Sequence, residues 1–185
     1  RFARIMPSIL LVSTVFCLIL GWRPESFLAR NLYYYNYDDA AIFDALSPLW
    51  SVALEMQFYV AIALIVMLMG RKGFWLIPVL ALLVPGNRVL EESIRTHLRV
   101  DEILAGCLLA LVWVNRDLPI AARAGRVMAV GFWAFVVLWA LSCWPPSGAL
   151  GYLRPYLGAA MVGGVLFGRE TWVHRMLSTK VLAYI

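Results

Sequence analysis

The chain has 185 residues, of which 63% are hydrophobic and 15% charged, and its mean hydropathy is +0.79. A soluble domain is about half apolar and about a quarter charged, so this chain holds more apolar residues than a soluble core can bury. The composition therefore indicates helices in lipid. The net charge of +5 does not predict a nucleic-acid partner, because the 16 basic residues stand singly or in pairs at the ends of apolar segments, where the membrane surface favours them.

Six segments are candidate membrane helices, since a spanning helix needs about 20 mostly apolar residues. They predict an all-α fold, a polytopic transmembrane helix bundle in which residues 1–185 form one domain. In chain order they are Ile5–Trp22, Pro48–Met69, Phe74–Val84, Arg99–Val114, Val127–Trp144 and Leu150–Phe167. The third can cross upright only if flanking residues snorkel or the bilayer thins. Because the chain runs from Arg1 to Ile185 without a polar tail, we expect a piece truncated at both ends.

The segments between these helices divide the charges unequally. A polar and aromatic loop is expected over Arg23–Ser47, a tight basic turn over Gly70–Gly73 and a basic linker over Asn115–Arg126. If every candidate crosses, ten of the 16 basic residues but only two of the 11 acidic residues fall on one side. Basic loops of membrane proteins face the cytoplasm, so we expect the basic side, with Arg1 and Arg4, to be cytoplasmic.

Glu55 is a carboxylate inside an apolar segment. A charge in the hydrocarbon costs at least about 2.5–3.5 kcal/mol, so its presence needs a reason. Ser51, Glu55 and Tyr59 recur every four residues and therefore share one face of a helix. Two interpretations follow: a structural carboxylate paired with an arginine of another helix, or a residue that lines a substrate cavity.

A second polar cluster, Arg99, Asp101 and Glu102, opens the fourth segment. Acids in a first turn are favoured by the helix dipole, which accounts for Glu102. Asp101 has two interpretations, the same dipole effect or a functional site within the membrane. His97 stands one residue too close to Asp101 for an H-x-x-x-x-D motif, which favours an interfacial histidine over a catalytic one.

Arg1 and Arg4 are three residues apart and share a helix face. They are either anchors at the cytoplasmic surface or a clamp for phosphate, which suits the guanidinium group. No spacing of cysteine, histidine or acidic residues predicts a metal site. The three cysteines lie in apolar runs without a C-x-x-C spacing and are expected to be small buried hydrophobes.

The segment from Pro48 to Tyr59, P-L-W-S-V-A-L-E-M-Q-F-Y, resembles the W-S-L-x-x-E-x-Q-F-Y signature of acyltransferase family 3. These are integral membrane O-acyltransferases of the O-antigen and exopolysaccharide acetylase type. Three further elements are similar to that family's motifs and come in the same order, R-x-x-R-I-x-P at residues 1–7, N-L-x-F at 31–34 and R-x-D-x-x-x-x-G at 99–106. The chain departs from the pattern at Met56, where a second acid often stands.

The resemblance implies acyl-CoA, commonly acetyl-CoA, as co-substrate with no bound cofactor, and a hydroxyl of a cell-surface or lipid-linked carbohydrate as acceptor. It implies a bacterial inner-membrane protein with a catalytic histidine upstream of Arg1, so that this piece alone is expected to be inactive. Within the chain it implies Glu55 and Asp101 as catalytic residues. The substrate-binding residues that it implies are Arg1 and Arg4 for the CoA phosphates, and Trp50, Ser51, Tyr59 and Arg99.

Two other classes of function remain open from the sequence. In a transporter, Glu55 and Asp101 would be relays for protons or substrate, because intramembrane acids mark such pathways. A non-catalytic sensor or anchoring module would instead tolerate substitution of Glu55. Neither class requires the four motifs to occur together.

Overall fold

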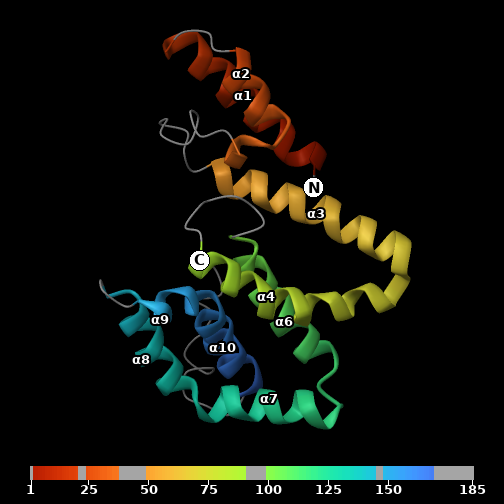
Figure 1. Ribbon diagram of the computed structural model, residues 1–185, viewed down its shortest axis with the longest axis vertical. Coiled ribbons are helices and arrows are strands. Elements are labelled where there is room, and N and C mark those ends of the chain that lie inside the picture. Colours follow the sequence, from red (N-terminus) through yellow and green to blue (C-terminus); the bar gives the residue numbers. More distant parts are fainter. Residues whose placement is uncertain (1, 21–23, 38–48, 91–98, 145–147, 169–185) are drawn as a thin grey trace, which may run out of the picture. The chain divides into compact units, whose positions relative to one another are not determined.

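The computed structural model describes residues 2–20, 24–37, 49–90, 99–144 and 148–168 (Figure 1). Every regular element in these ranges is helical, so the predicted all-α class is confirmed. The chain forms two compact units. Unit 1 comprises the described residues up to Leu76 together with Arg99 and Val100, and unit 2 comprises Ile77–Leu90 and the described residues from Asp101 onward.

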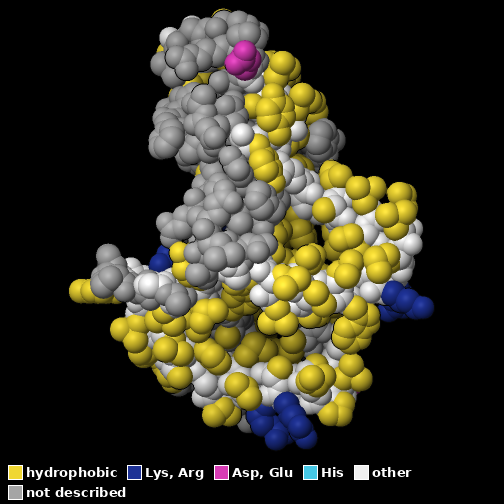
Figure 2. Space-filling model, in the orientation of Figure 1, with side chains coloured by type: hydrophobic (Ala, Val, Ile, Leu, Met, Phe, Trp, Pro, Cys, Tyr) yellow, Lys and Arg dark blue, Asp and Glu magenta, His cyan; other side chains and the backbone are white. Residues whose placement is uncertain are grey.

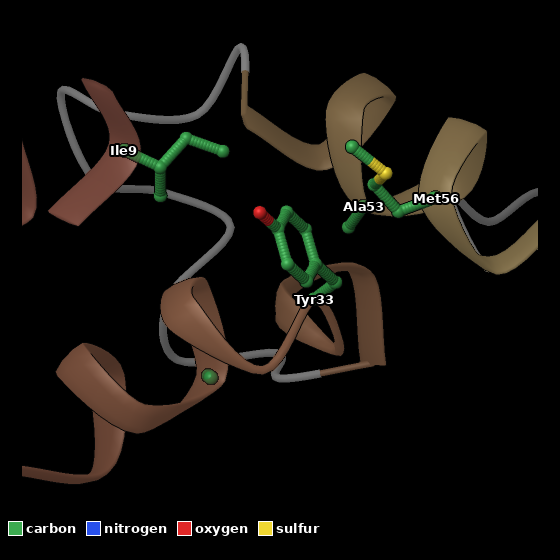
Figure 3. Close-up of a cluster of buried hydrophobic side chains, with 5 residues drawn as sticks. Ile9, Tyr33, Ala53 and Met56 are labelled. Carbon is green, nitrogen blue, oxygen red and sulfur yellow. The ribbon is translucent and has the colours of Figure 1, made fainter. Parts of the chain in front are cut away.

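Unit 1 is built on two long helices and the short elements that follow each. Its elements are α1 (Phe2–Leu20), α2 (Pro24–Asn31), the 3-10 turn η1 (Tyr35–Tyr37), α3 (Leu49–Met69) and the 3-10 segment η2 (Gly70–Trp75). A small core holds them together. The Tyr33 ring lies between Ile9 of α1 and the α3 side chains Ala53 and Met56 (Figure 3).

The end of α2 places Tyr33 in this core. The Tyr34 N–H donates to the Ala29 carbonyl at 3.0 Å, which is the wide hydrogen bond of a Schellman helix end. Tyr33 takes the left-handed position of that motif with φ +60°, a conformation that glycine adopts at less cost. The bulky ring at this position gains the burial that offsets the backbone strain, since only 6% of Tyr33 is exposed.

The predicted break after the second segment is confirmed at Gly70, whose φ is +58°. The chain folds back onto α3 there. The close approach shows at Gly73, where an added Cβ would lie only 3.1 Å from the Ile65 carbonyl oxygen. With 21 residues, α3 is roughly 31 Å long. It therefore matches the thickness of a bilayer's hydrocarbon core, which is about 30 Å.

Unit 2 is a bundle of shorter helices. Its elements are α4 (Leu76–Leu90, from Ile77 onward), α6 (Asp101–Val114), α7 (Pro119–Val130), α8 (Phe132–Ser142), α9 (Ala149–Tyr152) and α10 (Arg154–Phe167). The helix α10 packs against α6, α7 and α8. Glycines allow the helix backbones to approach closely: a Cβ on Gly164 would lie 2.8 Å from the Met128 carbonyl oxygen.

The directions of these helices follow from their contacts. Gly163 faces Leu109, and the rings of Phe167 and Trp113 meet edge to face at 5.3 Å, so α6 and α10 run parallel. The helix α8 runs the other way, because its beginning lies against Gly164 and its end at Ser142 accepts a 2.5 Å hydrogen bond from Arg154. That arginine caps the carbonyl end of α8, where a positive charge is favoured.

Pro85 lies inside α4 and cannot supply the N–H that would close a helical hydrogen bond to Ala81. The Tyr156 hydroxyl of α10 donates to the Ala81 carbonyl instead, at 2.6 Å. A distant side chain thus satisfies the backbone acceptor that the proline leaves behind. In lipid, where no water can take that role, such replacement is required.

Four sequence predictions are wrong. The expected loop Arg23–Ser47 contains the helix α2, and the expected helix Leu150–Phe167 is interrupted at Leu153 between α9 and α10. The expected linker Asn115–Arg126 is helical from Pro119, and the expected single helix Val127–Trp144 breaks at Gly131 between α7 and α8. Arginines lower the hydropathy of α7, and for this reason the sequence pattern predicts a linker there. The apolar residues on both sides of Gly131 conceal the break.

One helical stretch in the described part of the chain, Trp50–Gly86, is long and apolar enough to cross a membrane, and it is mostly on the surface rather than in a core. The pair α6 and α7 meets the same test together but is bent by 116°. Met6–Ile19 and Phe132–Ser142 are shorter apolar helices. The six predicted crossings are therefore not confirmed as six full-length helices.

Candidate functional site

The polar face predicted on α3 is present. Tyr59 donates its hydroxyl to the Glu55 carboxylate one turn away, so the two side chains share a face as their spacing predicts. Glu55 and Trp50 are half-buried, whereas Ser51 is exposed. The hydrogen bond from Tyr59 fixes the direction of the carboxylate, which is what a catalytic or substrate-binding acid requires.

Arg99 lies against this helix. Its guanidinium carbon is 5.1 Å from the centre of the Trp50 ring, a distance at which a cation is attracted to the face of an indole. Both residues belong to unit 1. The contact brings together two predicted substrate-binding residues that are far apart in the sequence.

Gln57 joins the same helix to the segment after α2. Its side-chain amide donates to the Tyr33 carbonyl at 2.5 Å and to Asn36 Oδ1 at 2.9 Å. Asn36 is fully buried. The sequence prediction missed Asn36 and gave Gln57 no role; the available signal was an amide inside the aromatic run Tyr33–Tyr37, where only a hydrogen-bonded polar group is stable.

Tyr33 also contributes a buried phenol to the core of unit 1. Removal from solvent raises the pKa of its hydroxyl, because the charged phenolate is disfavoured in an apolar environment. The group therefore stays neutral at physiological pH. Its carbonyl, aimed by the left-handed backbone, serves as the acceptor for Gln57.

Asp101 is the first residue of α6 and is fully buried. Glu102 beside it is exposed, which agrees with the dipole interpretation of Glu102 and singles out Asp101. Asp101 belongs to unit 2, whereas Glu55 belongs to unit 1. The two predicted catalytic carboxylates thus sit on separately packed parts of the chain.

The structure describes the remaining candidate residues only in part. Arg1 and His97 lie outside the described residues, and Arg4 lies on α1 with its side chain outside them. The cysteines are free thiols: Cys17 is buried, whereas Cys143 is exposed. Within the described ranges, no three histidine, cysteine or acidic side chains gather as a metal site would require.

Comparisons of the chain with protein-family models, with curated proteins and with solved structures find no match. The similarity to the acyltransferase motifs therefore rests on the four sequence elements themselves. The contacts of Arg99 with Trp50 and of Gln57 with the Tyr33 segment are independent of that similarity, because they come from the packing of unit 1.

Proposed function

We propose that the chain belongs to an integral-membrane acyltransferase. It moves an acyl group, commonly acetyl, from acyl-CoA to a hydroxyl of a cell-surface or lipid-linked carbohydrate. The protein lies in a bacterial inner membrane, with α3 as its clearest crossing and the Arg1 and Arg4 end in the cytoplasm. The exposed apolar surface of Trp50–Gly86 supports this placement, since lipid is the solvent that such a helix needs.

One observation carries the proposal. Three elements that resemble the family's motifs meet in unit 1: Trp50 of the first lies against Arg99 of the second, and Gln57 binds the carbonyl of Tyr33 in the third. Unrelated chance matches at these positions have no reason to converge. Elements that form one site do, because a site assembles side chains from separate segments.

The chemistry assigns a role to each group. A hydroxyl is a weak nucleophile, so a general base must take its proton as the oxygen attacks the thioester carbon and the CoA thiolate leaves. The resemblance gives the role of base to a histidine before Arg1. Glu55, held by Tyr59, orients that base or a sugar hydroxyl. Asp101 and Arg99 help to shape the acceptor side, and Arg1 and Arg4 bind the CoA phosphates.

The test uses membranes that contain the complete protein and acetyl-CoA labelled in the acetyl group. Glu55→Gln and Asp101→Asn should each lower transfer of label to glycan by about 100-fold or more, the usual contribution of an acid or base group. Glu102→Gln removes an exposed acid one residue from Asp101 and is the matched control, with near-normal transfer. Full activity of both variants at equal membrane abundance would refute the assignment.

A transporter is the second candidate, favoured by the buried acid Asp101 at the start of α6 and by the 116° break that follows the other end of this helix. Discontinuous helices with intramembrane acids are typical of transporters. Proteoliposomes distinguish the two functions. Label transfer without solute or proton flux supports the acyltransferase, whereas flux that Asp101→Asn abolishes supports the transporter.

A further inference from the structure

The helix α7 lies across one end of the unit 2 bundle (Figure 1). The parallel helices α6 and α10 both finish there, since Trp113 near the end of α6 meets Phe167, the last residue of α10, whose ring also covers Gly125 in the middle of α7. The chain turns by 116° between α6 and α7. If α6 crosses a membrane, α7 therefore cannot continue the crossing and runs closer to the membrane plane.

The two faces of α7 differ in chemistry. The inner face, with Ala121 and Gly125, is buried against the bundle. The outer face carries three aliphatic side chains that are largely bare, Ile120 at 78%, Val127 at 61% and Val130 at 83% exposure. Single exposed aliphatic residues are ordinary, but several on one helix face mark an interaction surface.

Arginines stand among these aliphatic residues. Arg123 and Arg126 are exposed on α7, and Arg116 is exposed in the turn before it. Figure 2 shows basic side chains projecting from this edge of unit 2 between hydrophobic ones. Asp117 is the one acid between residues 115 and 130, so the segment is net positive. A net positive segment next to a membrane is attracted to anionic lipid headgroups.

The contacts of Arg116 indicate that the start of α7 lies at the depth of the lipid headgroups. Its guanidinium lies 5.1 Å from the centre of the Trp113 ring and within 3.4 Å of the Trp113 carbonyl. Tryptophan collects at the level of the lipid headgroups, where its ring is in apolar surroundings and its edge is wet. An arginine stacked on such a ring is held at the level of the phosphates.

We propose that α7 is an interfacial helix that binds anionic phospholipid headgroups through Arg116, Arg123 and Arg126, with Ile120, Val127 and Val130 at the level of the headgroups. The inference rests on the membrane placement in the proposed function, but not on acyl transfer. It explains why a strongly basic, partly apolar helix closes the end of a bundle that is otherwise built from apolar helices.

Lipid binding tests the arginines. The full chain in neutral detergent is titrated with phosphatidylglycerol, and bound lipid is counted by native mass spectrometry. A basic residue near an anionic surface contributes about fivefold, so Arg123→Gln with Arg126→Gln should weaken binding about 30-fold. Arg123→Lys with Arg126→Lys keeps the charge and should bind within a few-fold of wild type. Unchanged binding by the glutamine pair, or an equal loss with phosphatidylcholine, overturns the proposal.

Depth tests the helix position. In a chain whose native cysteines are replaced by alanine, Ile120→Cys and Val130→Cys carry a fluorescent label, and lipids brominated at different depths quench it. Both positions should be quenched best by bromine near the headgroup end. Val60→Cys, near the middle of α3 and exposed on its surface, is the control and should be quenched best by bromine deep in the chains. Quenching of Ile120→Cys and Val130→Cys by aqueous iodide, without quenching by lipid, contradicts an interfacial α7.

Failure of the α7 proposal can be distinguished from failure of the proposed membrane placement. Release of the wild-type chain from membranes by alkaline carbonate would overturn both the membrane placement and the role of α7. A chain that resists carbonate while α7 stays in water and ignores phosphatidylglycerol overturns the α7 proposal alone. If the complete wild-type protein does not acylate glycan, only the proposed function is overturned.

Discussion

Gln57 is the residue that connects α3 to the segment carrying Tyr33 and Asn36. Both of its acceptors lie in a segment that has little other regular structure, the left-handed turn and η1. Asn36 is fully buried, and a buried amide that loses a donor keeps the full cost of its desolvation. The position of the segment against α3 therefore depends on this side chain as well as on the apolar residues around it.

Replacing Gln57 with Met keeps the length of the side chain and removes both donated hydrogen bonds. The protein should lose about 1–3 kcal/mol of stability, the cost of leaving a buried polar group without its partner. Thermal unfolding in detergent measures the change. Asn115→Leu removes a 2.8 Å amide hydrogen bond to the Leu111 carbonyl at an exposed position and should change stability by less than about 0.5 kcal/mol. Equal losses in the two variants would contradict the special role of Gln57.

At the scale of the helix, the sequence predicts chain breaks that depend on one residue. Gly70 ends α3 where expected, since glycine adopts the left-handed backbone that an abrupt helix end requires. The sequence does not predict the break at Gly131, because apolar residues on both sides conceal it, and it does not predict α7, whose close contact comes from elsewhere in the chain. A Cβ on Gly125 would lie 2.7 Å from the Phe167 ring, and that neighbour cannot be read from the local sequence.

The contribution of the hydrogen bond from Tyr156 to the Ala81 carbonyl can be tested with a compensating substitution at Pro85. Tyr156→Phe should destabilise the protein by about 1–3 kcal/mol, because the carbonyl that Pro85 leaves without an N–H then has no donor. Pro85→Ala restores the N–H one helical turn away. The double variant should regain most of the loss, which a double-mutant cycle of thermal unfolding measures. Additive losses would show that Tyr156 acts through packing alone.

Glycines of unit 2 differ in what surrounds them. Gly164→Ala places a Cβ 2.8 Å from the backbone oxygen of Met128, so α10 must move away from α7. The expected loss is about 1–3 kcal/mol, as for other overpacked sites. Gly106→Ala in α6 is the matched control, since nothing lies within 4 Å of its added Cβ, and alanine there should be neutral or stabilise the helix by up to about 1 kcal/mol. Thermal unfolding of both variants checks the contrast.

At the scale of the whole chain, sequence periodicity predicts some contacts of the candidate site and misses others. The shared face of Glu55 and Tyr59 follows from helix geometry alone. The contact of Arg99 with Trp50 and the hydrogen bond from Gln57 to Tyr33 join separate segments, and no local period encodes such pairs. Helix length was predicted less well, because hydropathy joins apolar residues across a break. With 11 residues, α8 is only roughly 16 Å long.

Whether α4 crosses the membrane together with α6 can be tested from two exposed positions, Lys72 in η2 and Asn115 after α6. If both α4 and α6 cross, as the six-segment topology requires, the two positions lie on the same side. If α4 does not cross, a single crossing by α6 separates them. Lys72→Cys and Asn115→Cys, in a chain without its native cysteines, are labelled with a membrane-impermeant maleimide in right-side-out and inverted vesicles. Because basic segments face the cytoplasm, both should react only in inverted vesicles. Reaction of the two positions from opposite sides would leave α4 as a helix that enters the membrane without crossing it.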